Sequence, residues 1–317
     1  VISGGGSTLL CLPEANGTCL EERTIIETLL RSGATIQEIN TIRKHLSLAR
    51  GGFLAQAAYP AQIISLIISD IPGDDISLVA SGPTVKDTST LDEADRILEK
   101  YQVLRVCGLD HCGLLETPKE DRYFEKVTNI LLATNQLGLE AMAAEATRLG
   151  YKPQIVTRAL TGEARRVALE IASTLHDSSP QTVLLYGGET TVTVTGRAGN
   201  GGRNQELALA ALSAVRADEI IVAVASDGHD NSDYAGAIAD VAARQKGLDL
   251  KLDLESYLAA NDSLTFFKQT GDYLLTGLTG SNVSDFLIAI KGEPVSTPAA
   301  TPATPNVLWL PEVGIAD

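Results

Sequence analysis

The sequence predicts an α/β fold made of two α/β domains with largely parallel sheets. Two observations carry this prediction: short apolar runs typical of buried strands recur along the chain, and helix-like segments separate several of them. Such alternation is typical of βαβ units, whose parallel sheets are covered by helices on both faces. With 317 residues, of which 44% are hydrophobic and 21% charged, the chain is long enough for a large core and for two domains.

The expected elements follow one another along the chain. Helices are expected to begin at Thr18, Thr35 and Thr90, because a Glu follows each Thr three residues later, as in a capping box. Further helices are expected at residues 136–149 and 163–175. The expected strands are the apolar runs at residues 62–69, 129–134, 153–157, 182–186 and 219–226.

A polar stretch at residues 176–180 (HDSSP) interrupts this pattern, and we place the domain boundary there. The first domain is then residues 1–178 and the second is residues 181–292. Residues 293–317 are rich in Pro, Thr and Ala. Such a segment cannot bury enough apolar surface to fold alone, so we expect a disordered tail.

Two glycine-rich loops are candidate anion sites. The first, residues 3–7 (SGGGS), follows the end of an expected strand, and the second joins an expected strand at residues 190–195 to a helix beginning at Asn204. Glycine lets backbone N–H groups converge on a ligand, and a helix N-terminus carries partial positive charge. The alternative for each loop is an ordinary turn with no ligand.

Neither loop fits a common nucleotide-binding motif. A dinucleotide fingerprint would need a glycine where Leu9 stands, and no lysine in the chain follows a glycine, so the P-loop motif is absent. The protein-kinase motifs are absent as well.

Acidic turns supply candidate metal ligands. Residues 69–75 (SDIPGDD) and 226–231 (SDGHDN) each follow an apolar run directly, which places carboxylates at the carboxyl edge of a sheet, where open α/β folds bind ligands. Clustered carboxylates there suit Mg²⁺. The alternative is that each Asp only stabilises its own turn.

Composition excludes two classes of partner. A formal net charge of -15 argues against a nonspecific grip on nucleic acid, which depends on Lys and Arg, and no apolar run is long enough to span a bilayer. The four cysteines form no dense framework, so reduced thiols are the expectation. No signal peptide is visible, which favours a cytoplasmic protein, although the start at Val1 leaves a removed N-terminus open.

Five motifs, in this order, resemble those of the glycerate 2-kinases, whose C-terminal part is known as the MOFRL domain. They are residues 40–52 (NTIRKHLSLARGG), 69–90 (SDIPGDDISLVASGPTVKDTST), 187–209 (GGETTVTVTG, GGRNQELAL), 226–231 (SDGHDN) and 262–285 (DSLTFFKQTGDYLLTGLTGSNVSD). The resemblance covers nearly everything from residue 2 to about residue 292. It implies a Rossmann-like N-terminal part, a MOFRL domain and a ligand cleft between them. It also implies phosphorylation of D-glycerate at its 2-hydroxyl by ATP with Mg²⁺, giving 2-phosphoglycerate and ADP.

The resemblance implies that the site residues of the family lie at the matching positions of this chain. We infer the role of each residue from the chemistry of its side chain. Arg203 is the first choice, because a planar guanidinium can hold two oxygens of a phosphoryl group or a carboxylate. The predicted catalytic residues are Arg203, Asp230 and Lys44. The predicted nucleotide-binding residues are Gly4, Gly5, Gly6, Ser7, Gly202 and Asn204. The predicted metal ligands are Asp227, Glu189 and Asp74. The carried-over set also includes Arg43, His45, Asp70, Asp75 and Glu206.

The chain departs from the family pattern in three places. Asn231 stands where the family usually has Gly, Leu278 stands where it has Pro, and the family's long N-terminal portion, with a lysine thought to serve catalysis, does not precede Val1. We therefore expect a fragment of a longer protein or a chain lacking part of the machinery. Two other functions stay open: a relic that binds nucleotide or glycerate without turnover, and a hydroxypyruvate reductase. The expected small-molecule partner of the chain is D-glycerate. A homodimer with a second copy of the chain is an open possibility.

Overall fold

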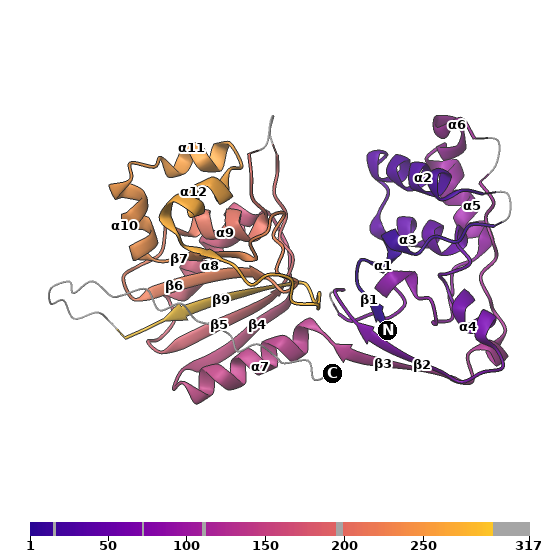
Figure 1. The fold of residues 1–317 in the computed structure, drawn as a ribbon, viewed down its shortest axis with the longest axis horizontal. Helices are drawn as coiled ribbons and strands as arrows, with labels where there is room; N and C mark the ends of the chain where they lie inside the picture. The colour runs from indigo at the N-terminus through magenta and orange to yellow at the C-terminus, as the bar shows by residue number, and fades with distance from the viewer. Residues whose placement is uncertain (15–16, 72, 110–111, 195–198, 294–317) are drawn as a thin grey trace.

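The computed structural model describes residues 1–14, 17–71, 73–109, 112–194 and 199–293. It contains two sheets that lie side by side in Figure 1. The first sheet is parallel, in the order β1-β2-β3, with β1 (Ile2–Ser3), β2 (Ile63–Ile68) and β3 (Val127–Ala133). The second has the order β4-β5-β9-β6-β7-β8, with β4 (Lys152–Leu160), β5 (Thr182–Gly188), β6 (Glu219–Ala225), β7 (Gly236–Ala239), β8 (Tyr273–Leu274) and β9 (Asp285–Lys291).

The α/β class is confirmed, and the second sheet is mixed. Strands β4 and β5 are parallel, whereas β9 runs antiparallel between β5 and β6. Strand β7 is antiparallel to both β6 and β8. The strands expected from the apolar runs are all present, as β2 to β6. Strand β7 is the next strand after β6 and pairs with it, whereas β9, the last strand in sequence, inserts between β5 and β6.

Helices begin where the sequence predicts. Both hydrogen bonds of the capping box are present at Thr18, Thr35 and Thr90, ahead of α2 (Cys19–Arg31), α3 (Ile36–His45) and α5 (Leu91–Lys100). The two other expected helices are α7 (Asn135–Arg148) and α8 (Ala164–His176). The remaining helices are α1 (Gly6–Leu9), α4 (Phe53–Ala58), α6 (Val103–Cys107), α9 (Arg203–Ala211), α10 (Val241–Asp249), α11 (Leu254–Ala259), α12 (Ser263–Thr270) and two 3₁₀ turns, η1 (Val79–Ser81) and η2 (Asp121–Tyr123).

The second sheet is covered by helices on both faces. Successive residues of strand β5 point to opposite faces and pack against different helices. Leu184 and Tyr186 of β5 belong to the large core formed with α8 and α9. Val183 and Leu185, which point to the opposite face, pack with α7. Figure 1 shows α7 on one side of this sheet and α8 to α12 on the other. The buried sheet therefore presents its strand ends, rather than its faces, to ligands.

Helix α7 joins the two sheets. It follows β3 directly, yet it packs on the second sheet, where a Cβ at Gly138 would lie 2.4 Å from the ring of Phe286. The side-chain amide of Asn135 donates to the backbone carbonyls of Val283 (2.9 Å) and Asp285 (3.1 Å). The division between the sheets thus lies between β3 and β4, whereas the domain limits at residues 178 and 181 stay a prediction. The predicted tail lies, from residue 294 on, outside the described residues.

Two expectations about local structure are wrong. In the described part of residues 190–195 there is no strand, because the chain leaves the sheet after Gly188 and only Thr191 forms an isolated bridge, with Glu163. Cys11 and Cys19 form a disulfide instead of remaining reduced, while Cys107 and Cys112 are free. The bridge is possible because the Cα atoms of Cys11 and of Cys19, the first residue of α2, lie 5.9 Å apart.

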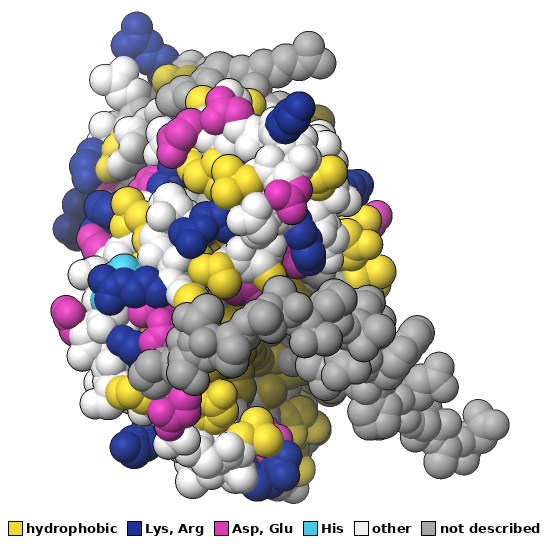
Figure 2. Space-filling view, turned by 90° about the vertical axis from the view of Figure 1, so that its left-hand side faces the viewer, with side chains coloured by type: hydrophobic (Ala, Val, Ile, Leu, Met, Phe, Trp, Pro, Cys, Tyr) yellow, Lys and Arg dark blue, Asp and Glu magenta, His cyan; other side chains and the backbone are white. Residues whose placement is uncertain are grey.

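Surface charge is mixed on the face that Figure 2 shows, where Lys and Arg side chains are scattered among acidic and apolar ones. None of the helices in the described residues combines the length and the apolar character that crossing a bilayer requires.

Candidate active site

Three strands bring the predicted polar residues to one edge of the second sheet. Asp285, the first residue of β9, pairs with Gly188 at the end of β5 and with Ala225 at the end of β6. The residues that follow these strand ends, Glu189 and Asp227, therefore lie at the same edge as Asp285. This edge is the ligand-binding edge expected for an α/β sheet.

Arg203 reaches this edge from the first position of α9. Its Nε donates to Oδ2 of Asp285 at 2.5 Å and its Nη2 donates to Oδ1 at 3.1 Å, so the fork predicted to hold ligand oxygens is held by Asp285. Nη2 also lies 3.2 Å from Oε1 of Glu189. Burial acts to lower the pKa of Arg203, but the hydrogen bonds and charge of Asp285 outweigh it and raise the pKa. The guanidinium is therefore charged at any working pH.

Asp230 is a buried carboxylate at the N-terminus of α9. It accepts hydrogen bonds from the backbone N–H groups of Asn204 (3.1 Å) and Gln205 (2.8 Å) and from the Asn204 side chain (3.2 Å). A Cβ at Gly202 would lie 2.2 Å from Oδ1 of Asp230, so glycine is required for this close approach. Burial raises the pKa of Asp230 to about 6, although the two backbone hydrogen bonds lower it. The helix N-terminus that the sequence suggested as an anion site thus binds the protein's own carboxylate.

The predicted metal ligands are not brought into one cluster. Glu189 pairs with Arg203, and Oδ1 of Asp227 accepts the backbone N–H of His229 at 2.8 Å, which is the turn geometry considered as the alternative. Asp74 lies after β2 with a left-handed φ of 56°, and none of its described contacts reaches Glu189 or Asp227. Within the described ranges, no group of three or more His, Cys, Asp or Glu side chains is arranged to hold a metal ion.

The carboxylates nevertheless influence one another across the two sheets. Burial raises the pKa of Glu189, the charge of Arg203 lowers it, and the charges of Asp285 and Asp70 raise it further. Burial also raises the pKa of Asp70, which follows β2 of the first sheet. Acidic residues from both sheets therefore share one electrostatic environment around Arg203.

The glycine loop after β1 packs against Asp70. The N–H of Gly4 donates to the carbonyl of Ile68 at 3.1 Å, and a Cβ at Gly4 would lie 1.9 Å from Cγ of Asp70. Gly5 has a left-handed φ of 73° and no atom within 4 Å of the position of a Cβ. Ser7 accepts a hydrogen bond from the hydroxyl of Ser81 at 3.2 Å. The loop is therefore anchored on both sides of Gly5.

Arg50 supports this loop from within. It is 1% exposed, pairs with Glu22 at 2.5 Å and donates to the carbonyl of Ser7 at 2.6 Å and to that of Leu10. The motif at residues 40–52 thus places a buried guanidinium under the glycine loop.

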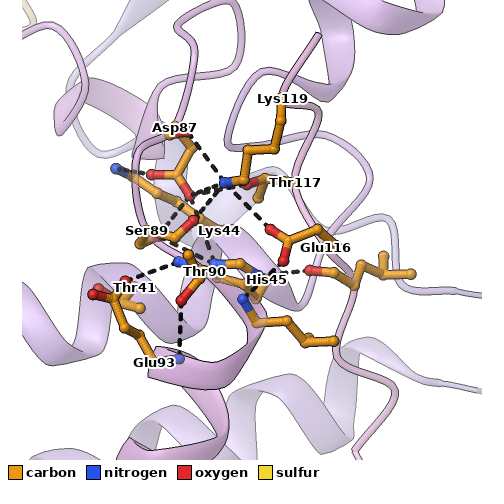
Figure 3. A network of polar contacts seen from close by, with 12 residues as sticks. Thr41, Lys44, His45, Asp87, Ser89, Thr90, Glu93, Glu116, Thr117 and Lys119 are labelled. Atoms are coloured by element: carbon orange, nitrogen blue, oxygen red, sulfur yellow. Dashed lines mark hydrogen bonds and ion pairs between the residues drawn. The ribbon is translucent and has the colours of Figure 1, made fainter.

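Lys44 lies apart from Arg203, in a buried polar network (Figure 3). Its Nζ donates to Oδ1 of Asp87 at 3.0 Å, and Lys119 and Ser89 contact the same carboxylate. Burial acts to raise the pKa of Asp87, but the hydrogen bond from Ser89 and the charge of Lys44 lower it. His45 joins the network by accepting from or donating to Ser89 at 3.1 Å. The catalytic role of Lys44 stays a prediction, and its contacts are those of a structural ion pair.

An open cavity of about 620 Å³ adjoins the edge of the second sheet. Arg203 and Asp230 contribute to its wall, together with the glycine-rich segment before α9. Its volume lies within the range of ligand pockets, roughly 300–1,000 Å³. The described lining residues are Glu189, Thr190, Thr191, Val192, Val194, Gly199, Gly201, Gly202, Arg203, Glu206, His229, Asp230, Asn231 and Asn261.

Sequence reasoning missed Asp285. This residue closes the motif at residues 262–285 and directly precedes the continuous apolar run of β9, residues 286–290. A carboxylate immediately before such a run is a signal in the sequence, but its meaning depends on the direction of β9, which the run does not record. Because β9 is antiparallel to its neighbours, its first residue lies where their last residues lie.

Comparisons with known proteins agree with this geometry. Residues 182–285 match the MOFRL family, and residues 1–108 match a domain of unknown function (DUF4147). The chain is 42% identical to a glycerate 2-kinase of Pyrococcus horikoshii and 38% identical to a D-glycerate 2-kinase of Thermotoga maritima, over 92% of this chain and 69% and 71% of those proteins. It is 41% identical to a putative hydroxypyruvate reductase of Agrobacterium vitis, over 92% of this chain and 69% of that protein.

Solved structures give the same result. The crystal structure of the Thermotoga maritima glycerate kinase superposes with a TM-score of 0.82 at 36% identity, covering 92% of this chain and 72% of that one. Sequence identity above 30% over most of both chains, with the same fold and the MOFRL match, leads to one conclusion: the chain belongs to the glycerate 2-kinase family.

Proposed function

We propose that the chain catalyses the phosphorylation of D-glycerate at its 2-hydroxyl by ATP, giving 2-phosphoglycerate and ADP. The observation that carries this proposal is a permanently charged guanidinium, Arg203, in the wall of an open cavity in a chain that resembles glycerate 2-kinases along most of its length. Phosphoryl transfer asks a protein chiefly for positioning and for stabilisation of charge on the transferred group. A fixed cation beside the cavity supplies that stabilisation.

The residues of the cavity wall suggest how the reaction proceeds. Arg203 stabilises the negative charge of the transferred phosphoryl group through Nη1, which has no hydrogen-bond partner among the described residues. Asp230, whose pKa is raised by burial to about 6, accepts the proton of the 2-hydroxyl near neutral pH. The hydroxyl oxygen bonds to phosphorus as the bond from phosphorus to the leaving oxygen of ADP breaks.

The donor set at the sheet edge fits Mg²⁺ as a partner of the nucleotide. Asp227 and Glu189 offer hard oxygen ligands, and Mg²⁺ commonly uses only one or two carboxylates together with phosphate oxygens and water. The ion would neutralise phosphate charge when bound. The nucleotide's phosphates would meet the backbone of the glycine loop at Gly4 to Ser7, next to Asp70.

One assay decides among the candidate functions. ADP formation with ATP and D-glycerate is measured beside NADH oxidation with hydroxypyruvate, using the same preparation. We expect ADP formation dependent on D-glycerate and no NADH oxidation. NADH oxidation alone would establish the reductase, and calorimetric binding of ATP or glycerate without either reaction would establish a non-catalytic binding protein.

A further inference from the structure

Asp285 holds Arg203 along one whole edge of its guanidinium. The contacts are Nε to Oδ2 at 2.5 Å and Nη2 to Oδ1 at 3.1 Å, a bidentate pair. The Asp285 side chain is 9% exposed, whereas that of Arg203 is 35% exposed. The pair is thus a buried anion that holds a cation partly open to the cavity.

Asp285 is itself fixed more firmly than the residues of the surrounding loops. It begins the central strand β9 and pairs on one side with Gly188 and on the other with Ala225. Its carbonyl accepts a hydrogen bond from the side chain of Asn135 at 3.1 Å, and the side chain of Asn204 contributes a further hydrogen bond to its carboxylate. A carboxylate on a central strand is a rigid reference point for a flexible arginine.

Glu189, the second acidic partner of Arg203, makes a single contact and is more exposed than Asp285. Glu189 lies in the loop after β5, its side chain is 43% exposed, and it contacts only Nη2, at 3.2 Å. The bidentate contact therefore decides the orientation of the guanidinium, and Glu189 adds to it. Nε and Nη2 are engaged, whereas Nη1 has no hydrogen-bond partner among the described residues, and Arg203 lines the cavity.

We infer that Asp285 is a positioning residue that orients Arg203 toward the transferred phosphoryl group. This inference rests on the proposed function and adds a residue that acts through Arg203 without touching the substrate. Arginine has several rotatable bonds, and a misplacement of about 1 Å at a reacting centre can cost about 100-fold in rate. The carboxylate of Asp285 removes that freedom before the substrate binds.

The first test is Asp285→Asn in the full chain, which keeps the shape of the side chain but removes its charge and one acceptor oxygen. We expect kcat to fall by about 10- to 100-fold, the range typical of supporting residues around a site, with KM for D-glycerate and for ATP changed less than about threefold. An Asp285→Asn protein with the kcat of the unsubstituted chain would overturn the inference.

The matched control is Glu219→Gln, at the opposite end of the same strands. Glu219 is a fully buried carboxylate at the first position of β6 and pairs with Lys291 at the end of β9, far along the strands from Arg203. Loss of a buried carboxylate from the sheet is common to both variants, so any loss of stability should be shared. We expect Glu219→Gln to keep kcat within about twofold.

A double-substitution cycle separates positioning from a general effect on the site. If Asp285 acts through Arg203, Asp285→Asn should change kcat by less than about twofold when Arg203 is already Lys. Multiplicative effects of the two substitutions would overturn the inference.

Titration of ATP into the same four proteins gives a readout that needs no turnover. The dissociation constant of ATP should change by less than about threefold in Asp285→Asn, and a larger loss of ATP affinity would count against a role limited to orienting Arg203 for the transferred group. An unsubstituted protein that binds ATP but forms no ADP from D-glycerate would refute the proposed function, whereas an active unsubstituted protein whose kcat is unchanged by Asp285→Asn would refute only the inference about Asp285.

Discussion

Replacement of Asp230 by Asn makes the stability of the protein depend on pH in a calculable way. Asp230 is 3% exposed and receives its hydrogen bonds from the first turn of α9. Burial raises its pKa from an ordinary 3.8 to about 6. Asn occupies the same space and has no proton to gain or lose in this range. Its NH2 group replaces one of the two accepting oxygens, and the cost of that lost hydrogen bond does not change with pH.

The sign and the size of this pH dependence of stability follow from the raised pKa of Asp230. The folded chain binds this proton more tightly than the unfolded chain, so the contribution to stability is fully present below pH 3.8 and is lost as the pH rises through about 6. The full difference corresponds to roughly 3 kcal/mol. Between pH 7.5 and pH 5, the tighter proton binding of the folded chain raises the unfolding free energy by about 1.4 kcal/mol. Relative to Asp230→Asn, the unsubstituted protein should therefore gain about 1.4 kcal/mol of unfolding free energy over that interval.

Urea unfolding of both proteins at pH 5, 6 and 7.5 measures this difference directly. Asp240→Asn is the matched control, because Asp240 caps α10 through Ala243 at 2.7 Å but is not buried. A difference between the two proteins that stays constant across the three pH values, or that moves in the opposite direction, would refute the reasoning about the burial of Asp230.

Three further predictions concern the site. Arg203→Lys keeps the charge but loses the bidentate contact with Asp285. We therefore expect kcat to fall roughly 10³-fold and the unfolding free energy to fall by about 1–3 kcal/mol. A variant with normal kcat and normal KM would show that Arg203 has no role in the site. Gly5→Val should lower the unfolding free energy by roughly 2 kcal/mol because φ of Gly5 is 73°, and the control Gly33→Val should lower it equally, because its φ is 75° and its Cβ position is equally open. Only Gly5→Val should also weaken ATP binding. Equal ATP affinities in the two variants would show that the loop has a purely structural role. EDTA should abolish ADP formation and Mg²⁺ should restore it, while full activity in chelator would contradict a role for a metal at Asp227 and Glu189.

Local signals in the sequence were sufficient for part of the fold: the three helices with capping boxes, α7, α8 and the strands β2 to β6. Each capping box at Thr18, Thr35 and Thr90 involves residues three positions apart, and both of its hydrogen bonds form in the structure. The apolar runs likewise correspond to strands, because burial of a strand is recorded in its own residues. These features need no knowledge of distant parts of the chain.

Partners distant in sequence were not predictable in this way. Asp230 caps a helix that begins 27 residues earlier, and Asp285 holds an arginine 82 residues away. Both contacts depend on the order and direction of strands, which the apolar pattern does not record. The acidic turn at residues 226–231 and the glycine loop before α9 were identified separately, but their contact with each other was not.

The same contacts explain why we expect activity to depend on a cation although no preformed cluster of ligands exists among the described residues. Asp285 is committed to Arg203, and Asp230 is committed to the first turn of α9, so each already has a positive partner. Glu189 shares Arg203 with Asp285, and the described contact of Asp227 is a backbone amide. Among the described lining residues of the cavity, Arg203 is the single Lys or Arg, so a polyanionic nucleotide would meet an edge with more negative than positive charge. A divalent ion that arrives with the nucleotide and binds carboxylate oxygens of Glu189 and Asp227 would reverse that balance. We therefore expect metal dependence from the charges and not from a finished metal site.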